Sequence, residues 1–469
     1  MAYSVACCYA RLADADRAVE ALSDALERGF RDLHRPQSDE HWKPLLTDTK
    51  VREMLGIIDA AALSRDDGWR ADLDFLAREI TRRARAPFEH LRPEQLSSQV
   101  AELNSKIPDL SDLQITLEMA RIVRQLGDGH ALVAPAQADL AHFPALPLDA
   151  YLFDEGPFVI AAGSHHRDLL GARIDRVGIH DTAVVLQALE GVISRDNDQQ
   201  FRFIAPGWLR LPTVLHALGL IEDPGEVTLT LTQMDDSTSQ VSISAEPAAV
   251  SQLMPPYPDG WTELPDTLST PRPPYLRRRE LPYWFEYLAA EDLIYFQFNS
   301  VRDHPAEPFG QFCDRLFGCI ASRRPARLVI DMRFNGGGNT FLGQPLLHHV
   351  IGCPAINRRG ALFVIIGRMT FSAAQNIATM LEQHTNATFV GEPTGSRPNF
   401  IGESVPFELP VSKVVVNVSD LYWQTGYPMD HRPWIAPQLY APPTFESFSR
   451  NHDPALAAVL AATGNLPGS

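Results

Sequence analysis

A serine and a run of glycines are the residues of this sequence best suited to acyl-transfer chemistry. Ser372 lies between a short apolar segment that ends at Gly367 and a segment in which apolar residues recur at helical spacing. A serine at such a strand-to-helix turn stands beside unpaired amides and the positive end of the helix dipole, which together can stabilise an oxyanion. The alternative is that Ser372 is simply the N-cap of the helix, a position at which serine is common.

The glycine run follows a second predicted strand, upstream of the first. Residues 327–338 read RLVIDMRFNGGG, in which a buried strand over 328–330 leads into three consecutive glycines. Glycines let the backbone approach a ligand closely and turn its amides toward it, although a glycine run alone is also typical of an ordinary loop. Taken together, the two turns supply amide donors and a hydroxyl, which are the parts of an acyl-transfer site.

These stretches resemble those of the tail-specific (C-terminal-processing) serine proteases, a family that includes the tricorn core protease. The resemblance rests on DMRFNGGG at 331–338, TFSAAQ at 370–375 and GEPT at 391–394, and it extends over roughly residues 69–469. It implies a crotonase/ClpP-like catalytic domain of ββα units, with Ser372 as the nucleophile. The expected oxyanion donors are the backbone amides of Gly337 or Gly338 and of Ala373.

The Ser372 hydroxyl needs a base, because a serine hydroxyl is far too weak an acid to ionise at neutral pH. In the tail-specific branch a lysine stands 25 residues after the serine, and this chain has Arg397 at that position. An arginine stays protonated and cannot accept the proton, so we expect Arg397 to anchor substrate or pair with a carboxylate. The stretch GDGH at 127–130 is similar to the one that carries the catalytic histidine in the tricorn-like branch, which makes His130 the expected base.

A third group is expected to orient His130 and to stabilise its protonated form. In the tricorn-like branch a glutamate near the C-terminus does something similar. The comparable segment here, PMDHRPWIAPQ at 428–438, makes Asp430 the expected acid. The family spacing points one residue further, to His431, and Glu403 is the other nearby carboxylate. The choice between Asp430 and Glu403 therefore stays open.

The elements that must position these residues divide into five segments, which together predict a multidomain α/β protein. Residues 1–60 are expected to be helical and resemble a tetratricopeptide helix pair, with a plain helical hairpin as the alternative. Residues 61–140 are expected to form a helical domain that ends in the GDGH turn, and residues 141–254 a β-rich domain with an insertion. A proline-rich linker over 255–282 leads into the catalytic domain, residues 283–469.

The β-rich segment resembles the PDZ-like domain of the same family. PDZ domains bind a peptide by adding it to a sheet edge and capture its terminal carboxylate with backbone amides. The usual glycine-rich carboxylate loop is absent, and residues 146–148, LPL, stand in its place. We expect this domain to position polypeptide substrates, and whether it captures a terminal carboxylate stays open.

Composition and charge exclude several classes of partner. The chain has 469 residues, 45% of them hydrophobic, and a formal net charge of −17, so it should repel nucleic acids and anionic membranes. It contains no apolar run of membrane-spanning length and no HExxH, CxxC or phosphate-binding loop, so we expect no metal or other cofactor. The N-terminus lacks the pattern of a secretory signal, which predicts a cytoplasmic protein unless a leader has been removed. The five cysteines show no framework spacing and are expected to be buried, reduced thiols.

The sequence thus predicts a serine peptidase that hydrolyses peptides or unfolded polypeptides through an acyl-enzyme on Ser372, with His130 as general base. Because one helical repeat cannot bury its own face, a protein partner or a second copy of the chain is expected at the N-terminal helices. Two alternatives stay open: a non-catalytic ligand-binding protein on the same fold, and a scaffold whose helical and PDZ-like segments carry the function.

Overall fold

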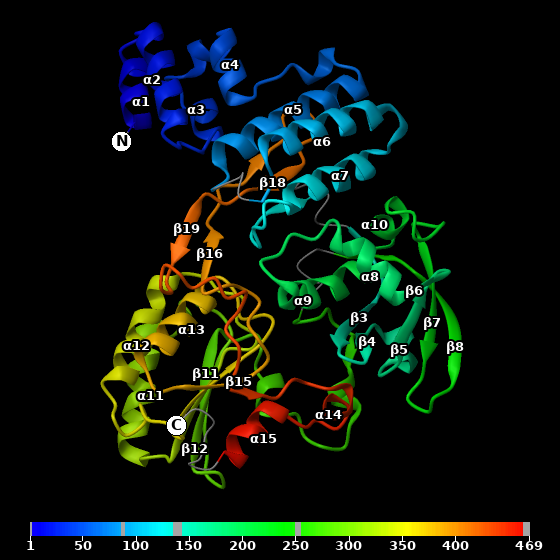
Figure 1. Cartoon of the computed structure of the whole chain (residues 1–469), viewed down its shortest axis with the longest axis vertical. Helices are drawn as coiled ribbons and strands as arrows, with labels where there is room; N and C mark the ends of the chain where they lie inside the picture. The colour runs from blue at the N-terminus through cyan, green and yellow to red at the C-terminus, as the bar shows by residue number, and fades with distance from the viewer. Residues whose placement is uncertain (1, 86–89, 135–142, 249–254, 463–469) are drawn as a thin grey trace. The chain divides into compact units, whose positions relative to one another are not determined.

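The computed structural model describes residues 2–85, 90–134, 143–248 and 255–462. The chain divides into two compact units (Figure 1). The first unit comprises Met1–Ala141, Gly191–Arg195 and Ile401–Tyr422, and the second unit comprises His142–Glu190, Asp196–Phe400 and Trp423–Ser469.

The first unit is mainly helical, as the apolar spacing within the segments 1–60 and 61–140 predicts. Side chains of Asp14, Asp48, Ser64 and Ser111 cap four of its helices by accepting backbone N–H bonds, which explains why those helices begin where they do. Its helices are α1 (Ala2–Arg11), α2 (Ala15–Glu27), α3 (His34–Ser38), η1 (Lys43–Thr47), α4 (Thr49–Leu55), η2 (Ala60–Ala62), α5 (Arg65–Arg83), α6 (Pro93–Lys106), η3 (Ile107–Asp109) and α7 (Asp112–Arg124).

A segment from far along the sequence completes the first unit. The strand β1 (Leu132–Ala134) pairs with β18 (Val415–Asn417), and β18 pairs with β17 (Phe407–Glu408). The buried carboxylate of Asp72 in α5 fixes this returning segment, because it accepts the backbone N–H groups of Val411 and Ser412 at 2.7 Å each. The chain enters the first unit along β16 (Asn399–Gly402) and leaves it along the paired strand β19 (Leu421–Gln424).

The second unit contains a seven-stranded β-rich sheet with the main order β10-β4-β5-β7-β8, in which β3 pairs with β4 and β6 with β5. The alternation of buried and exposed residues along β7 explains why that strand is recognisable in the sequence. The elements of this region are β2 (Phe143–Ala145), β3 (Leu148–Phe153), β4 (Gly156–Ala162), η5 (Ser164–Leu169), β5 (Arg173–Val177), β6 (His180–Asp181), α8 (Thr182–Glu190), α9 (Asp198–Leu209), α10 (Pro212–Ala217), β7 (Glu226–Thr232), β8 (Thr238–Ser244), β9 (Glu246–Ala248) and β10 (Thr262–Glu263).

The proline-rich stretch after this sheet is more structured than a simple linker. It contributes β10 to the sheet and forms the 3-10 turns η7 (Leu264–Thr267) and η8 (Pro274–Leu276). A proline stands at the beginning of each turn, where its missing N–H and fixed φ cost nothing. The prolines therefore shape ordered turns against the sheet.

A second sheet, with the order β11-β12-β13-β14-β15-β20, lies at the centre of the expected catalytic domain. Its first pair is antiparallel and the remaining pairs are parallel. The strands are β11 (Tyr283–Leu288), β12 (Leu293–Phe298), β13 (Arg327–Asp331), β14 (Leu362–Ile366), β15 (Thr388–Gly391) and β20 (Leu439–Tyr440). The helices are α11 (Phe309–Arg323), η9 (Thr340–Gly343), α12 (Gln344–Ile351), α13 (Ala373–His384), α14 (Phe445–Phe448) and α15 (Pro454–Ala461).

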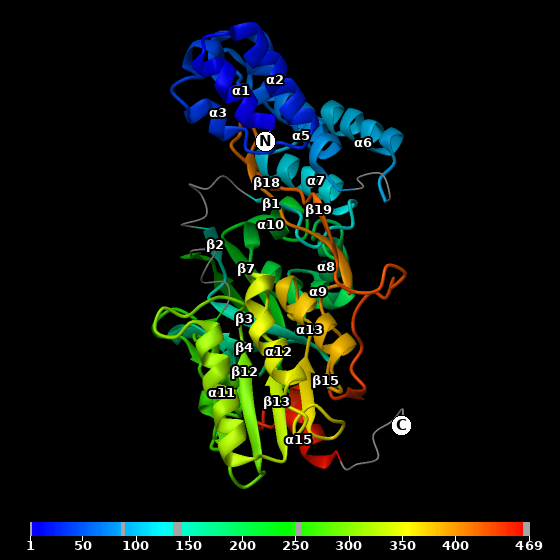
Figure 2. The same ribbon diagram turned by 90° about the vertical axis from the view of Figure 1, so that its left-hand side faces the viewer.

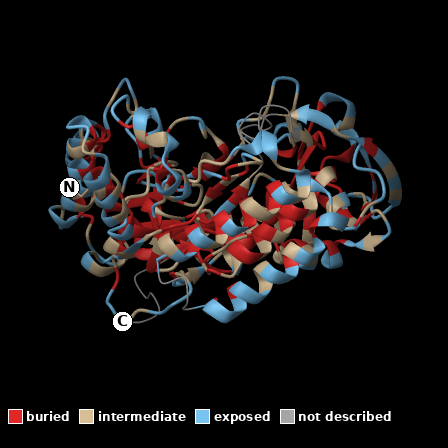
Figure 3. Cartoon of the chain, turned by 90° about the horizontal axis from the view of Figure 1, so that it is seen from above, coloured by how far each residue is buried: buried red, intermediate tan, exposed pale blue. Residues whose placement is uncertain are grey.

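Helices cover both faces of this central sheet (Figures 1 and 2). Along β14, Leu362, Val364 and Ile366 face a core shared with α11, α12 and α13. Phe363 and Ile365 face the opposite core, which α15 closes. Because successive residues of a strand point to opposite faces, covering both faces requires a continuous apolar run such as that of β14. Figure 3 shows the complementary pattern in the helices, which are buried along one side and exposed along the other.

The cysteines differ in part from the expectation. All five are free, but only Cys313 is buried; Cys8 is exposed, and the other three are half-buried. Cys7 and Cys8 lie off the buried face of α1, which is formed by Tyr3, Ala6 and Ala10 at helical spacing. None of the described helices is both long enough and apolar enough to cross a membrane.

Candidate active site

Ser372 lies at a sharp turn between β14 and α13, at the carboxyl end of the central sheet. Its backbone angles are φ 55° and ψ −125°, a combination that residues other than glycine rarely adopt. Holding a non-glycine residue there costs about 1–3 kcal/mol, and such strain concentrates at functional sites. Ser372 occupies the N-cap position of α13, yet its side chain makes no capping hydrogen bond. The plain N-cap interpretation therefore lacks the bond on which it depends.

The loop after β13 holds this turn in place. Thr370 donates its hydroxyl proton to the carbonyl of Met332 at 2.9 Å, and the Phe371 N–H donates to the carbonyl of Asn335 at 3.1 Å. Because β13 and β14 are parallel neighbours, the loops at their carboxyl ends meet at the same edge of the sheet. The glycine run and the serine turn are therefore brought together by the topology of the sheet.

The backbone of the glycine run lies directly against Ser372. A Cβ added to Gly337 would stand 2.8 Å from the Cβ of Ser372 and 2.9 Å from the amide nitrogen of Ala373. A Cβ added to Gly338 would collide with the carbonyl oxygen of Val301. Both glycines also have φ in the range that disfavours side chains, 106° and 136°. Only glycine fits at these two positions.

The three predicted amide donors differ in how they are used. The N–H of Gly337 donates to Oδ1 of the buried Asn335 at 3.0 Å, and Nδ2 of Asn335 donates to the Phe298 carbonyl at 2.9 Å. Among the hydrogen bonds made within the described ranges, none uses the N–H of Gly338 or of Ala373. These two amides can therefore donate to a ligand oxygen. Asn335, to which the sequence motifs assign no role, fixes the conformation of the glycine run.

His130 follows α7 in a turn organised by Asp128. One carboxylate oxygen of Asp128 accepts the backbone N–H of His130 at 2.8 Å, and the other accepts that of Ser419 at 3.0 Å. Nδ1 of the half-buried His130 ring lies 4.0 Å from Oδ1 of Asp128. Gly127, with φ 66°, makes the turn possible. His130 thus belongs to the first unit, whereas Ser372 and the glycine run belong to the second.

The two carboxylates considered as partners of His130 have different surroundings. Asp430, in the second unit, accepts three hydrogen bonds from the Arg432 guanidinium, at 3.0, 3.2 and 2.8 Å, and these bonds lower its pKa. Arg432 also makes a bidentate pair with Glu382, at 2.9 and 2.7 Å. Glu403, in the first unit with His130, has φ 63°. Its charge adds to the pKa rise that burial causes at the neighbouring Asp420.

Arg397 is tied to the insertion of the β-rich domain. Its Nε donates to the Asp196 carbonyl at 3.2 Å, and the neighbouring Ser396 hydroxyl donates to the Asp196 carboxylate. Arg397 is half-buried, and its expected role in pairing or anchoring stays a prediction.

A buried ion pair near the serine turn was not foreseen from the sequence. Arg368, four residues before Ser372, makes a bidentate pair with Glu392, with its Nε 3.3 Å from Oε2. It also donates to the Leu152 carbonyl at 2.6 Å, and its guanidinium carbon lies 4.6 Å from the centre of the Tyr151 ring. The GEPT motif marks Glu392, but no local pattern reveals its partner.

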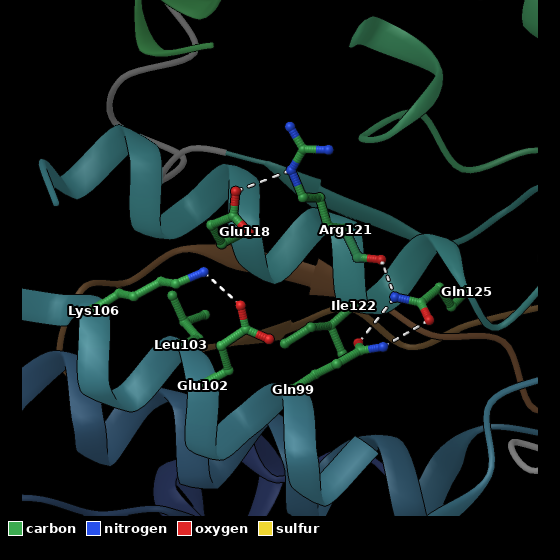
Figure 4. Close-up of a pocket in the computed structure, with 8 residues that line it drawn as sticks. All are labelled: Gln99, Glu102, Leu103, Lys106, Glu118, Arg121, Ile122 and Gln125. Carbon is green, nitrogen blue, oxygen red and sulfur yellow. Dashed lines mark hydrogen bonds and ion pairs between the residues drawn. The ribbon is translucent and has the colours of Figure 1, made fainter. Parts of the chain in front are cut away.

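A pocket between α6 and α7 in the first unit contains none of the predicted site residues (Figure 4). Its charged side chains pair with one another, Lys106 with Glu102 and Arg121 with Glu118, and its glutamines Gln99 and Gln125 exchange hydrogen bonds. In the part of the chain that the structure describes, no group of three histidine, cysteine or acidic side chains is placed to hold a metal ion.

Comparison with known proteins shows the fold but no close sequence relative. No protein-family model and no curated protein match the chain. Mature CPAF matches with a TM-score of 0.60 at 13% identity, over 86% of this chain and 99% of that one. CPAF complexed with lactacystin matches with a TM-score of 0.59 at 13% identity, over 82% and 96% of the two chains. The photosystem II D1 C-terminal processing protease has a TM-score of 0.41 at 13% identity, over 86% of this chain and 98% of that one. This likeness is too low to support an argument by itself. The multidomain α/β fold of this chain is thus shared with CPAF.

Proposed function

We propose that this protein is a serine peptidase in which Ser372 is the nucleophile. The observation that carries the proposal is the strained backbone of Ser372, packed against the glycine run and lacking a capping bond. A strained strand-to-helix turn that exposes a serine beside free amides is the arrangement that acyl-transfer enzymes use. The fold shared with CPAF and the GEPT and TFSAAQ motifs also support a peptidase on a crotonase/ClpP-like catalytic domain.

In the proposed reaction, Oγ of Ser372 attacks the carbonyl carbon of a peptide bond while His130 accepts the hydroxyl proton. The oxyanion of the tetrahedral intermediate is stabilised by the N–H groups of Gly338 and Ala373, while Gly337 shapes the loop. His130 gives the proton to the leaving amine, which departs and leaves an acyl-enzyme. Water, activated by His130, then releases the acid and restores Ser372. Asp430 or Glu403 is proposed to orient His130.

The other domains are proposed to serve substrate selection. The β-rich domain, proposed to be PDZ-like, positions peptides or unfolded polypeptides by strand addition, and Arg397 anchors substrate or the neighbouring loop. The N-terminal helices, proposed to be tetratricopeptide-like, bind a partner protein or a second copy of the chain. The acidic charge of −17 argues against nucleic acid or anionic membrane as a partner. We propose a cytoplasmic setting because all five cysteines are free.

The proposal is tested by labelling with a fluorophosphonate, which reacts only with an activated serine. The wild-type protein should label on Ser372, as mapped by peptide mass spectrometry, and should cleave unfolded casein. Ser372→Ala should do neither, whereas Ser322→Ala, which alters an exposed serine on α11, should behave like the wild type. Because CPAF has been solved with lactacystin, that compound is a second probe. A wild-type protein that neither labels nor cleaves would support the non-catalytic alternatives.

A further inference from the structure

Two aromatic side chains near the serine helix, one exposed and one half-buried, lie outside the buried core. Phe341, in the short turn η9 just after the glycine run, is 66% exposed. Its ring centre lies 6.3 Å from that of Trp423 in β19, with the two planes tilted by 56°. Trp423 is half-buried. Contiguous apolar side chains at a surface can mark a binding site, whereas single exposed ones are ordinary.

Both aromatics are held in place relative to Ser372 by one buried side chain. Asn376, one helical turn after Ser372 in α13, is 1% exposed. Its Nδ2 donates to the Thr340 hydroxyl at 3.0 Å, and its Oδ1 accepts the Thr425 hydroxyl proton at 2.7 Å. Thr340 directly precedes Phe341, and Thr425 is two residues from Trp423. The amide therefore joins the two segments that carry the aromatic rings to the first turns of the serine helix.

The turn that carries Phe341 also packs tightly on this helix. A Cβ added to Gly343 would stand 2.5 Å from the side chain of Ile377, so η9 lies directly against α13. Nδ2 of Asn376 donates to the hydroxyl of Thr340 in this turn. Asn339 caps the turn, because its side chain accepts the Phe341 N–H at 3.1 Å. These contacts fix the backbone of Phe341 while its ring stays in solvent. The ordered turn therefore keeps the ring of Phe341 exposed.

The position of the pair relative to the amide donors suggests its use. The N–H groups that can hold a substrate carbonyl belong to Gly338 and Ala373, and η9 begins two residues after Gly338. The chain therefore runs from one of these amides directly into the turn that carries Phe341. An apolar side chain placed on the two rings would remove its own surface and that of Phe341 from water.

We propose that Phe341 and Trp423 form an apolar subsite that binds a large apolar side chain of the peptide substrate close to the scissile bond. The inference rests on the proposed peptidase function and adds a substrate class to it: peptides with leucine, methionine or phenylalanine at one defined position. Phe341 supplies the exposed contact surface, Trp423 supports it from β19, and Asn376 is a positioning residue for both.

The test compares rates of cleavage for a series of peptides that carry leucine, phenylalanine or serine at each position around the bond that the wild type cuts. We expect the wild type to prefer leucine or phenylalanine over serine at one position by about tenfold or more in kcat/KM. Phe341→Ser should reduce this preference to about twofold, chiefly through KM, and Phe341→Leu should restore most of it. Ile351→Ser, which changes a 45% exposed side chain at the end of α12, should keep the wild-type preference.

A binding measurement separates this subsite from catalysis. In the Ser372→Ala background, calorimetry should show that the leucine peptide binds about tenfold more weakly when Phe341 is also changed to serine, whereas the serine peptide is affected little. Cleavage without any preference in the wild type, or an equal loss of all peptides in Phe341→Ser, overturns the subsite and leaves the peptidase intact. Absence of both labelling and cleavage in the wild type overturns the proposed function and the subsite together.

Discussion

The backbone of Gly337 touches the side chain of Ser372 so closely that an added Cβ would lie only 2.8 Å from the serine Cβ. The two residues come from different strand-to-loop connections, and their contact sets the geometry of the serine turn. A methyl group at position 337 must therefore displace the turn, the glycine run, or both.

Gly337→Ala is expected to lower the rate of fluorophosphonate labelling by roughly 100-fold, because a displacement of about 1 Å suffices for a loss of that size. Its free energy of unfolding should also fall by about 1–3 kcal/mol, since the residue has φ 106°. Gly318→Ala is the matched control: Gly318 lies in α11 with no neighbour within 4 Å of an added Cβ, so the change should stabilise the protein by about 0.5–1 kcal/mol and leave labelling intact. If Gly337→Ala labels at the wild-type rate, the contact between Gly337 and Ser372 does not set the geometry of the serine turn.

The strain at Ser372 predicts an order of stability among inactive variants. Ser372→Gly and Ser372→Ala should both lose labelling, because each lacks the hydroxyl. Glycine adopts φ 55° and ψ −125° freely, so relief of about 1–3 kcal/mol of strain should offset the usual glycine penalty of about 0.5–1 kcal/mol. Thermal unfolding should therefore show Ser372→Gly to be at least as stable as Ser372→Ala. A glycine variant that is clearly the less stable would show that the turn is not strained.

If His130 is the base, kcat/KM should rise from acidic toward neutral pH, because a general base must be unprotonated to accept the proton of the serine hydroxyl. His130→Ala should lose about 10²- to 10⁴-fold in rate, the usual contribution of a general base, while His41→Ala at an exposed position should be unaffected. Arg397→Lys should keep the wild-type profile. A profile still rising near pH 10 would assign the proton transfer to another group.

The orienting carboxylate can be identified by comparing two isosteric changes. Asp430→Asn or Glu403→Gln should lower kcat by roughly a hundredfold or more, depending on which carboxylate supports His130. The Arg432 guanidinium holds the pKa of Asp430 below its ordinary value of 3.8. A carboxylate with a depressed pKa stabilises the fold above its unfolded pKa and loses that contribution as the pH falls through the folded value. The stability difference between wild type and Asp430→Asn should therefore shrink below about pH 4. Normal kinetics in both variants would exclude both carboxylates.

The buried pair of Arg368 and Glu392 should be costly to break and cheaper to replace. Glu392→Gln leaves a guanidinium that is 4% exposed without its counter-charge, so the free energy of unfolding should fall by about 3–5 kcal/mol. Adding Arg368→Met to Glu392→Gln removes the remaining charge, and the double variant should recover part of that loss. Chemical denaturation of the wild type, the two single variants and the double variant measures the coupling. Additive losses would mean that the pair is not energetically coupled.

The sequence predicts the site best where local patterns determine structure. The apolar runs at 328–330 and 361–366, each followed by a loop, give β13 and β14 because a sheet covered on both faces needs continuous apolar strands. The glycine run and the serine turn then follow from the parallel order of the sheet.

What the sequence does not predict depends on contacts between distant residues. The bonds of Asp72 to Val411 and Ser412, and of Asp128 to Ser419, bring residues 401–422 into the first unit, and no local pattern encodes them. The backbone angles of Ser372 and the partner of Arg368 are likewise set by packing. The tetratricopeptide-like and PDZ-like assignments and the catalytic roles stay predictions.

The pairing of β1 with β18 has a consequence for the order in which the chain is made. Residues 132–134 leave the ribosome long before residues 415–417, so the sheet next to His130 stays incomplete until almost nine-tenths of the chain has been synthesised. The strands on either side of Ser372 are complete by then. In a nascent or truncated chain that ends before residue 415, the serine turn is therefore present, while the strand that pairs with β1 next to His130 is missing.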